Sequence, residues 1–336
     1  MFNQNLYNTT YHKEDISSAK FLVTGGAGFI GSNLVEYLLK YGAGHVRVLD
    51  NLSNGYMENI EAFLSLPNFE FMEGDIRDLQ TCKRAVEGMD FISHQAALGS
   101  VPRSIKDPIT TNQVNISGFL NMLVAAKDSP SCKRLVYAAS SSTYGDSAAL
   151  PKVEGQEGKP LSPYAVTKAV NEYYAEVFSR VYGFNTIGLR YFNVFGPKQN
   201  PNNPYAAVIP IFCKAFIDDN FPVINGDGLT SRDFTFVENA VQANILAMLF
   251  HNVTVHEVFN VACGDQTTLN GMVEILKKIS KKSIDAQYRE ERKGDVKHSK
   301  ANIDKIKNKL GFKPSINFIS GIEIVYEWYK KSENPQ

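Results

Sequence analysis

The chain has 336 residues, of which 43% are hydrophobic and 21% charged, with 35 basic and 35 acidic side chains. This composition is typical of a globular protein with one large domain or two closely joined ones. The net charge of zero excludes the strong basic field that attracts nucleic acid or an anionic membrane surface.

The four cysteines, Cys82, Cys132, Cys213 and Cys263, lie far apart and form no CxxC pair, so no disulfide framework is expected. The first residues lack the apolar core of a signal peptide, and no apolar run has the length of a membrane-spanning helix. We therefore expect a cytoplasmic protein with neither a membrane nor a nucleic acid as its partner.

Residues 1–18 are polar and show no periodic pattern, and we expect a short helix or an arm there. From Lys20 onward, short apolar runs alternate with helical patterns, the first of which ends at Gly42. Strands are expected at residues 20–25, 45–50, 69–75, 90–97, 134–140 and 185–196. This alternation predicts an α/β fold, a Rossmann-type doubly wound parallel sheet with helices on both faces.

After Gly196 the pattern changes, because residues 196–210 are rich in Pro and Asn and are expected to form a loop. A helix is expected at residues 209–219, and a strand at 256–262 returns to the main sheet. We expect three parts: an N-terminal extension (1–18), a Rossmann domain (19–195, with returns near 234–264) and a smaller lobe (mainly 196–336) interleaved with it.

A glycine-rich turn joins the first expected strand to the first helix. The segment TGGAGFIG places Gly25, Gly28 and Gly31 at a GxxGxxG spacing. Glycine permits a tight turn and the close approach of a diphosphate, and the following helix N-terminus offers free N–H groups to the phosphates. The segment is therefore expected to bind a dinucleotide, although the glycine pattern alone would fit a plain structural turn.

Asp50 stands 19 residues after Gly31, at the end of the second expected strand. An acid near this offset binds the ribose 2′-hydroxyl of a dinucleotide and repels a 2′-phosphate. Residues 51–55 offer no arginine to receive such a phosphate, so we expect NAD rather than NADP as the cofactor. Asp75, after the third strand, is expected either at the adenine ring or as the N-cap of the next helix.

Tyr164 and Lys168, in the segment YAVTK, lie four residues apart at the start of an expected helix. Such residues share one helix face, and an ammonium ion close to a phenol favours the ionised phenol. The pair is therefore a candidate general base. His94 is expected to be a packed, hydrogen-bonded residue, because no second His or Cys lies at metal-ligand spacing, and no metal site is expected.

The motif TGGAGFIG, Asp50, the serine cluster AASSSTYG and the YxxxK pair together closely resemble the extended short-chain dehydrogenase/reductase superfamily, in its nucleotide-sugar-modifying members. The resemblance covers residues 20–329. The segments QAALGSVPRS, LRYFNVFGPKQ, AAVIP, NGDGLTSRDF and RKGDVKHS are similar to those of the UDP-N-acetylglucosamine 4-epimerases. This implies reversible C4 epimerisation of UDP-N-acetylglucosamine (UDP-GlcNAc) to UDP-N-acetylgalactosamine (UDP-GalNAc), with UDP-glucose and UDP-galactose as a further pair.

The resemblance also implies roles for individual residues. Tyr164 would be the catalytic base, and Lys168 would lower its pKa and hold the nicotinamide ribose. Counting back from Gly145 without a gap makes Ser140 the catalytic serine, whereas one gap would give that role to Ser142. The remaining serines would face the sugar or its N-acetyl group.

The glycine pattern, Asp50 and the resemblance together define an expected cofactor site: Gly25, Gly28, Phe29, Ile30, Gly31, Asp50, Asn51, Ser53, Asn54, Gly55, Asp75, Ile76, Gln95, Ala96, Ala97, Tyr164 and Lys168. The resemblance assigns to the UDP-sugar Ser100, Arg103, Ser141, Ser142, Tyr164, Asn193, Ala207, Val208, Asn225, Arg232, Arg292, Asp295 and Ser299. Arg232 and Arg292 would bind the diphosphate, for which a planar guanidinium is well suited.

Epimerisation at C4 needs a temporary ketone, because a C–H bond next to an alcohol is not acidic. Tyr164 as phenolate would take the 4-hydroxyl proton while C4 gives a hydride to NAD⁺, and the 4-keto sugar would turn over and take the hydride back. In related dehydratases an Asp-Glu pair follows the catalytic Ser/Thr, and related decarboxylases carry a Glu in that region. Ser141 and Ser142 stand there in this chain, so elimination and decarboxylation are disfavoured.

Ser299 matches the position at which epimerases restricted to non-acetylated sugars carry a bulky Tyr, so the resemblance implies room for an N-acetyl group, although Ser299 could also be a plain turn residue. The alternatives are a UDP-glucuronate or UDP-N-acetylhexosaminuronate 4-epimerase, and a non-catalytic NAD-bound protein of the same fold. The resemblance further implies a homodimer, to which the helix from Tyr164 would contribute its apolar residues: Val166, Val170, Tyr173, Tyr174, Val177 and Val181.

Overall fold

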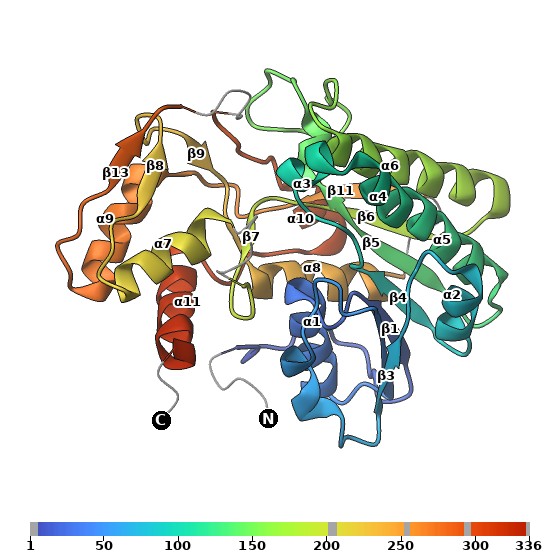
Figure 1. The fold of residues 1–336 in the computed structure, drawn as a ribbon. Helices are drawn as coiled ribbons and strands as arrows, with labels where there is room; N and C mark the ends of the chain where they lie inside the picture. The colour runs from blue at the N-terminus through green and yellow to red at the C-terminus, as the bar shows by residue number, and fades with distance from the viewer. Residues whose placement is uncertain (1–5, 201–206, 252–255, 292–296, 334–336) are drawn as a thin grey trace.

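A computed structural model describes residues 6–200, 207–251, 256–291 and 297–333. Its centre is a seven-stranded sheet in the order β11-β6-β5-β4-β1-β2-β3, in which every neighbouring pair is parallel (Figure 1). The strands are β1 (Lys20–Thr24), β2 (His45–Asp50), β3 (Phe69–Glu73), β4 (Phe91–His94), β5 (Arg134–Ser140), β6 (Thr186–Tyr191) and β11 (Glu257–Val261). The predicted α/β class and the parallel sheet are thereby confirmed, but the strand expected at 185–196 ends at Tyr191, and Val194–Phe195 belong to a separate two-stranded sheet.

Helices cover both faces of this sheet. One face packs against α1 (Phe29–Lys40) and α8 (Val237–Leu249); the other packs against α2 (Leu79–Val86), α5 (Phe119–Asp128) and α6 (Pro163–Tyr182). The strands serve both layers, because Phe21 and Val23 of β1 belong to one buried cluster and Leu22 between them belongs to the other. This alternation is why the strand reads as a continuous apolar run in the sequence.

A smaller lobe stands beside the main sheet (Figure 1). It contains α7 (Val208–Ile217), α9 (Leu269–Ser280), α11 (Phe318–Glu333) and the short strands β8 (Val223–Asn225), β9 (Ser231–Arg232), β12 (Thr267–Thr268) and β13 (Gln287–Arg289). Between these segments the chain returns to the sheet through β10 (Thr235–Phe236), α8, β11 and α10 (Asp304–Leu310). The helix expected at 209–219 is α7, and the strand expected at 256–262 is β11.

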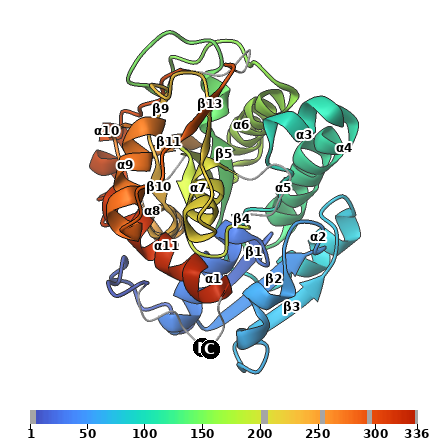
Figure 2. The same cartoon turned by 60° about the vertical axis from the view of Figure 1, so that its left-hand side comes forward.

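Short elements complete the connections: α3 (Val101–Lys106), α4 (Pro108–Asn112), β7 (Val194–Phe195), the 3-10 turns η1 (Met57–Asn59), η2 (Glu61–Phe63) and η4 (Ser141–Tyr144), and the π-helical η3 (Gln113–Gly118). Figure 2 shows α3, α4, α5 and α6 together on one side of the molecule. In the described part of the chain no helix is both long and apolar enough to span a membrane.

The helix that carries the YxxxK pair has well-defined ends. It begins at Pro163, one residue before Tyr164, because Ser162 accepts a hydrogen bond from the Ala165 N–H at 3.1 Å and proline fits the first helical position. Gly183 ends it in the left-handed region, with φ of +66°. These ends fix which residues of α6 face the sheet.

The N-terminal extension is an arm, since residues 6–18 form neither a helix nor a strand. Its sequence is patternless, yet Leu6 and Tyr7 are completely buried against α1. The Tyr7 hydroxyl donates to Asn33 Oδ1 at 2.7 Å, and the Tyr41 hydroxyl donates to the Tyr7 carbonyl oxygen at 2.7 Å. Further along, the Tyr11 hydroxyl reaches Glu238 of α8. The arm therefore ties the first helix of the sheet to α8.

We predict that Tyr7→Phe destabilises the protein by about 1–3 kcal/mol, because it leaves the buried Asn33 Oδ1 without this donor. The measurement is the free energy of unfolding in urea, monitored by circular dichroism. Tyr182→Phe is the matched control, because Tyr182 is 55% exposed. Equal stabilities of the Tyr7→Phe variant and the unsubstituted protein would show that the arm does not anchor α1.

Candidate active site

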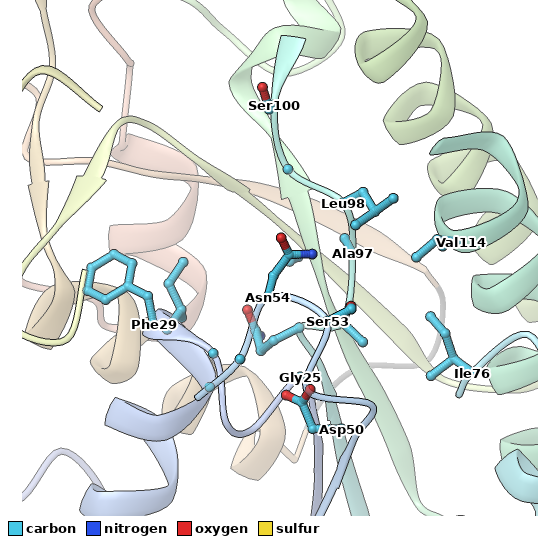
Figure 3. Close-up of a pocket in the computed structure, with 18 of the residues that line it drawn as sticks. Gly25, Phe29, Asp50, Ser53, Asn54, Ile76, Ala97, Leu98, Ser100 and Val114 are labelled. Carbon is cyan, nitrogen blue, oxygen red and sulfur yellow. The ribbon is translucent and has the colours of Figure 1, made fainter. Parts of the chain in front are cut away.

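A cavity of about 540 Å³ opens at the carboxyl ends of the central strands. Its lining comes from the loops after β1, β2, β3 and β4, from the end of β5, from the start of α6 and from the segment after β6. In Figure 3 the glycine turn and Asp50 lie at one end of the close-up and Ser100 lies at the other. Ligands in open parallel sheets bind at this edge, where loops from distant parts of the chain meet.

The glycine turn between β1 and α1 leaves space for a ligand. Gly25 has φ of +67°, and a Cβ there would lie 2.7 Å from the Ala96 nitrogen. A Cβ on Gly31 would lie 2.2 Å from the Gly25 carbonyl oxygen, so the turn closes only because both residues are glycine. No side chain of the described residues caps the start of α1, whose N-terminal amides therefore suit a phosphate.

Asp50, at the end of β2, is held rigidly beside this turn. Its Oδ2 accepts from the Ala27 N–H at 3.0 Å, and its Oδ1 accepts from the Leu52 N–H at 2.9 Å. Burial raises the pKa of this carboxyl, whereas the backbone hydrogen bonds lower it. A Cβ on Gly55 would lie 2.9 Å from Asp50 Oδ2, so glycine there keeps the carboxylate accessible. This arrangement fits an acid that receives a ribose hydroxyl.

Asp75 does not cap a helix. The N-cap of α2 is Asp78, which accepts from the Gln80 and Thr81 N–H groups. Asp75 instead pairs with Arg77 at 2.7 Å and accepts from Asn51 Nδ2 at 2.9 Å. The Arg77 hydrogen bond is the main cause that lowers the pKa of Asp75 to about 2. The N-cap alternative is therefore wrong, and Asp75 lies on the cavity wall.

The segment after β4 forms another wall of the cavity. Gln95 is fixed there, because its Nε2 donates to Ser93 Oγ at 2.9 Å and its Oε1 accepts from the Tyr191 hydroxyl at 3.2 Å. His94 is buried and shares a 2.8 Å hydrogen bond with Thr24 Oγ1. Burial lowers the pKa of His94 to about 3, so it is a neutral packed residue, as predicted.

Tyr164 and Lys168 both line the cavity from the first turns of α6. Lys168 is almost fully buried, and its Nζ donates to the Ala138 carbonyl oxygen at 2.7 Å. Desolvation lowers the pKa of Lys168 to about 8. The Nζ lies 5.9 Å from the centre of the Tyr164 ring.

The pKa of Tyr164 shifts upward, whereas the spacing of the pair predicts a phenol that ionises more easily. Burial raises the pKa of Tyr164 in this structure, and a hydrogen bond with Ser140 lowers it only in part. The spacing of the pair did not reveal this, because desolvation of the phenol outweighs a charge that lies across the ring.

Among the three serines, Ser140 and Ser141 line the cavity. Ser140 Oγ, at the end of β5, accepts from Ser142 Oγ at 2.9 Å and from the Ser142 N–H at 3.2 Å. Ser142, which does not line the cavity, therefore holds the Ser140 side chain in place. This geometry favours Ser140 over Ser142 as the serine beside the reacting hydroxyl.

The residues expected at the sugar are divided between two places. Ser100, Arg103 and Asn193 line the cavity, and Asn193 is held by a 2.9 Å bond from its Nδ2 to the Asp233 carbonyl oxygen. Arg232 and Ser299 meet at β9, because Arg232 Nη1 and the Ser299 N–H both donate to the Ser231 carbonyl oxygen, at 3.0 and 3.1 Å.

The other expected substrate residues do not line this cavity. Ala207 and Val208 stand at the start of α7, and Asn225 ends β8. Arg292 and Asp295 lie outside the described residues.

Several lining residues have no individual role in the site expected from the sequence. They include Leu98, Gly99, Val114, Ala138, Ala139, Tyr191 and Val194, of which all but Val114 lie in the quoted motifs. Val114 comes from the π-helical η3 and lies opposite Phe29 across the cavity in Figure 3. Their common feature is position, since most follow or end a parallel strand. Within the described ranges, no three His, Cys, Asp or Glu side chains are grouped so that they could hold a metal ion.

Comparison with known proteins agrees with this geometry. Residues 22–325 match the family described as GDP-mannose 4,6 dehydratase. A putative UDP-glucose 4-epimerase of Methanocaldococcus jannaschii is 34% identical over 93% of this chain and 98% of its own length.

Two solved structures are also similar. A UDP-N-acetylglucosamine 4-epimerase of Methanobrevibacter ruminantium M1, in complex with UDP-N-acetylmuramic acid, is 38% identical, with a TM-score of 0.88 over 94% of this chain and 99% of its own. A UDP-glucuronic acid 4-epimerase of Bacillus cereus, in complex with UDP-glucuronic acid and NAD, is 29% identical, with a TM-score of 0.86 over 93% and 99% of the two chains. The chain therefore belongs to this family of nucleotide-sugar enzymes, in the branch of the UDP-sugar 4-epimerases.

Proposed function

We propose that the protein catalyses the reversible C4 epimerisation of UDP-GlcNAc to UDP-GalNAc, with NAD as its bound cofactor. The observation that carries this proposal is the meeting of Ser140, Tyr164 and Lys168 in the same cavity as the glycine turn. A base, a hydroxyl partner and a dinucleotide site within one cavity are the parts that a transient oxidation needs.

The residues present fit NAD. The Gly25–Gly31 turn and the start of α1 would hold the diphosphate, and Asp50 would bind the adenosine ribose. Tyr164 and Lys168 would bind the nicotinamide ribose. When bound, NAD supplies a reversible hydride acceptor for the sugar carbon.

The residues of the chain itself would remove and return one proton, that of the sugar 4-hydroxyl. Tyr164 removes the proton of the 4-hydroxyl as that carbon is oxidised, and Ser140 orients the same hydroxyl through the hydrogen bond that it shares with Tyr164. Lys168 supports the phenolate electrostatically. The 4-keto sugar would then present its opposite face, where the return of the hydride inverts C4, while Tyr164 returns the proton to the oxygen.

The distribution of carboxylates argues against elimination. Of the described residues that line the cavity, the carboxylates are Asp50 and Asp75, both in the half that fits the adenosine. Ser141 and Ser142, in η4, take the positions where a dehydratase needs a second acid and base. Epimerisation without elimination requires neither a second acid nor a second base.

The N-acetyl preference rests on Ser299. Its N–H binds the Ser231 carbonyl oxygen, whose residue also shares a 2.8 Å side-chain hydrogen bond with His298. The backbone here is therefore fixed. Ser299 does not itself line the cavity, and the proposal is that its small side chain, where the restricted epimerases carry a Tyr, would leave room for an acetamido group. The 38% identity to a UDP-N-acetylglucosamine 4-epimerase supports this assignment.

UDP-glucuronate, or an N-acetylated uronate, is the second candidate substrate. A uronate would need a cation near its carboxylate, and Arg103 is the described arginine that lines the cavity. A UDP-glucuronate 4-epimerase of Thermodesulfobacterium geofontis is 32% identical to the chain. The substrate assay below separates these sugars directly.

We also propose a cytoplasmic homodimer. The outer face of α6 is apolar, with Tyr173 67% and Val181 63% exposed, and Ile105 and Ile109 of the adjoining α3 and α4 are equally uncovered. An apolar face of this kind is typical of an interface with a second copy. The four cysteines are free thiols, which fits a reducing compartment.

The first prediction from the proposed function concerns turnover. The purified protein, given UDP-GlcNAc without added NAD, should form UDP-GalNAc, and Tyr164→Phe should lower kcat by about 10²- to 10⁴-fold because the base is lost. Chromatography of the UDP-sugars measures both. Conversion of UDP-glucuronate in place of UDP-GlcNAc would transfer the assignment to the second candidate.

The second prediction concerns the sugar selectivity. Ser299→Tyr should abolish turnover of UDP-GlcNAc and retain that of UDP-glucose, because the larger side chain would fill the space for the acetamido group. Ser299→Ala is the matched control and should retain both activities. If Ser299→Tyr lowered both activities equally, Ser299 would not be the gate.

The third prediction concerns assembly. The unsubstituted protein should sediment as a dimer, and Tyr173→Asp combined with Val181→Asp should give a monomer, because two buried charges would oppose association. Analytical ultracentrifugation measures the mass. A monomeric unsubstituted protein would contradict the dimer.

A further inference from the structure

Behind the catalytic pair lies a cluster of three charges, two of them buried, that the proposed reaction does not use. Arg190 of β6 donates through Nε and Nη2 to the two carboxylate oxygens of Glu172, at 2.9 and 2.7 Å. Its Nη1 also pairs with Glu157, in the segment between η4 and α6. The Arg190 and Glu172 side chains are only 4% and 12% exposed. One cation shared by two carboxylates leaves a net charge of −1, although the Glu157 side chain is 29% exposed.

This excess charge lies next to Lys168. Glu172 follows Lys168 by four residues on α6, so the two side chains occupy one face of the helix. Lys168 Nζ is bonded to the Ala138 carbonyl oxygen, which carries no full charge. In the described part of the chain no carboxylate forms an ion pair with Lys168 Nζ. The ammonium therefore depends on a carboxylate one turn away for its compensation.

We propose that Glu172, anchored by Arg190, is a positioning residue that keeps Lys168 protonated in the working enzyme. The proposal rests on the role of Lys168 in the proposed function. Burial opposes the ammonium form of Lys168, and Glu172 is the charged group that raises the pKa of Lys168 against that burial. Burial raises the pKa of Glu172, and the hydrogen bonds and charge of Arg190 lower it in part, so Arg190 favours the ionised carboxylate.

Among the titratable groups around Lys168, Glu172 is the one whose negative charge favours the ammonium form. Facing Lys168 and Glu172 from the surrounding elements are His94 on β4, Tyr137 on β5, Tyr144 in η4, Glu157, Tyr164 and Arg190. Burial lowers the pKa of His94 to about 3 and raises the pKa values of Tyr137 and Tyr144, so all three are neutral near pH 7. Glu176 and His256 lie further out, beside Tyr137.

The same cluster also supports the serine turn. The Arg190 guanidinium stacks on the ring of Tyr144, 4.8 Å from its centre, and the Tyr144 hydroxyl donates to Asn260 at 2.7 Å. Tyr144 is the last residue of η4, which begins directly after Ser140. Arg190 therefore connects α6 to the turn after the catalytic serine, and its replacement would disturb both. Glu172 is the better target for a test.

The test is Glu172→Gln in the full-length protein, compared by the pH dependence of kcat/KM. Removal of the negative charge disfavours the Lys168 ammonium, so the pKa of Lys168 falls. The basic limb of the profile should then move to lower pH by about half a unit or more. Glu157→Gln is the matched control, since it removes the other carboxylate on Arg190, which does not share the face of α6 with Lys168. It should shift the limb less.

A further variant separates the effect of the Glu172 charge from any structural role of the Glu172 side chain. Glu172→Asp keeps the charge and should restore the position of the basic limb, even if the shorter side chain lowers kcat. A uniform loss at all pH values in Glu172→Gln, with an unshifted limb, would overturn the proposal. Glu172 would then have a structural role only.

A readout without turnover distinguishes this proposal from the proposed function. The protein labelled with ¹³C at the lysine ε carbons can be titrated by NMR, and the Lys168 signal is identified by its loss in Lys168→Met. Its midpoint should be lower in Glu172→Gln than in the unsubstituted protein. Equal midpoints would refute the role of Glu172 even in an active enzyme, whereas a shifted midpoint in a protein without turnover would refute only the epimerase assignment.

Discussion

The site depends on the burial of one ammonium group. Lys168 lies almost out of contact with water, with a carbonyl oxygen as its hydrogen-bond partner, so its charged form is costly. Tyr164 is partly buried, and burial raises its pKa as well, so the phenolate that the proposed reaction requires would depend on the Lys168 ammonium beside it. The surrounding charges therefore matter as much as the pair itself.

The parallel sheet makes this arrangement possible. The carboxyl ends of its strands meet at one edge, where β1 and β2 supply the glycine turn and Asp50, and β5 supplies Ser140. The C-terminal half of the chain contributes to the same edge, since Asn244 of α8 donates to the Tyr191 hydroxyl at 2.7 Å. Tyr191 in turn donates to Gln95, so α8, β6 and the loop after β4 are connected by side chains within the site.

Sequence periodicity was sufficient for the sheet, because strands buried on both faces are short apolar runs that glycine and proline separate clearly. It failed for the arm, where Leu6 and Tyr7 are buried through contacts with α1 that no local pattern encodes. Spacing identified Tyr164 and Lys168 as neighbours, but it could not give the sign of the pKa shift of Tyr164, which depends on burial. Val114 was missed for a related reason, since a π-helical segment brings it to the cavity.

In the proposed reaction, C4 is inverted through removal and return of the same hydride. The direct measurement is turnover of UDP-GlcNAc that carries deuterium at C4, in ordinary water, followed by mass spectrometry and NMR of the UDP-GalNAc formed. Retention of deuterium at C4 of the product is the predicted result, because a hydride held inside the closed site does not exchange with solvent. Replacement of the deuterium by solvent hydrogen would contradict the account and would require an exchangeable proton at C4 instead.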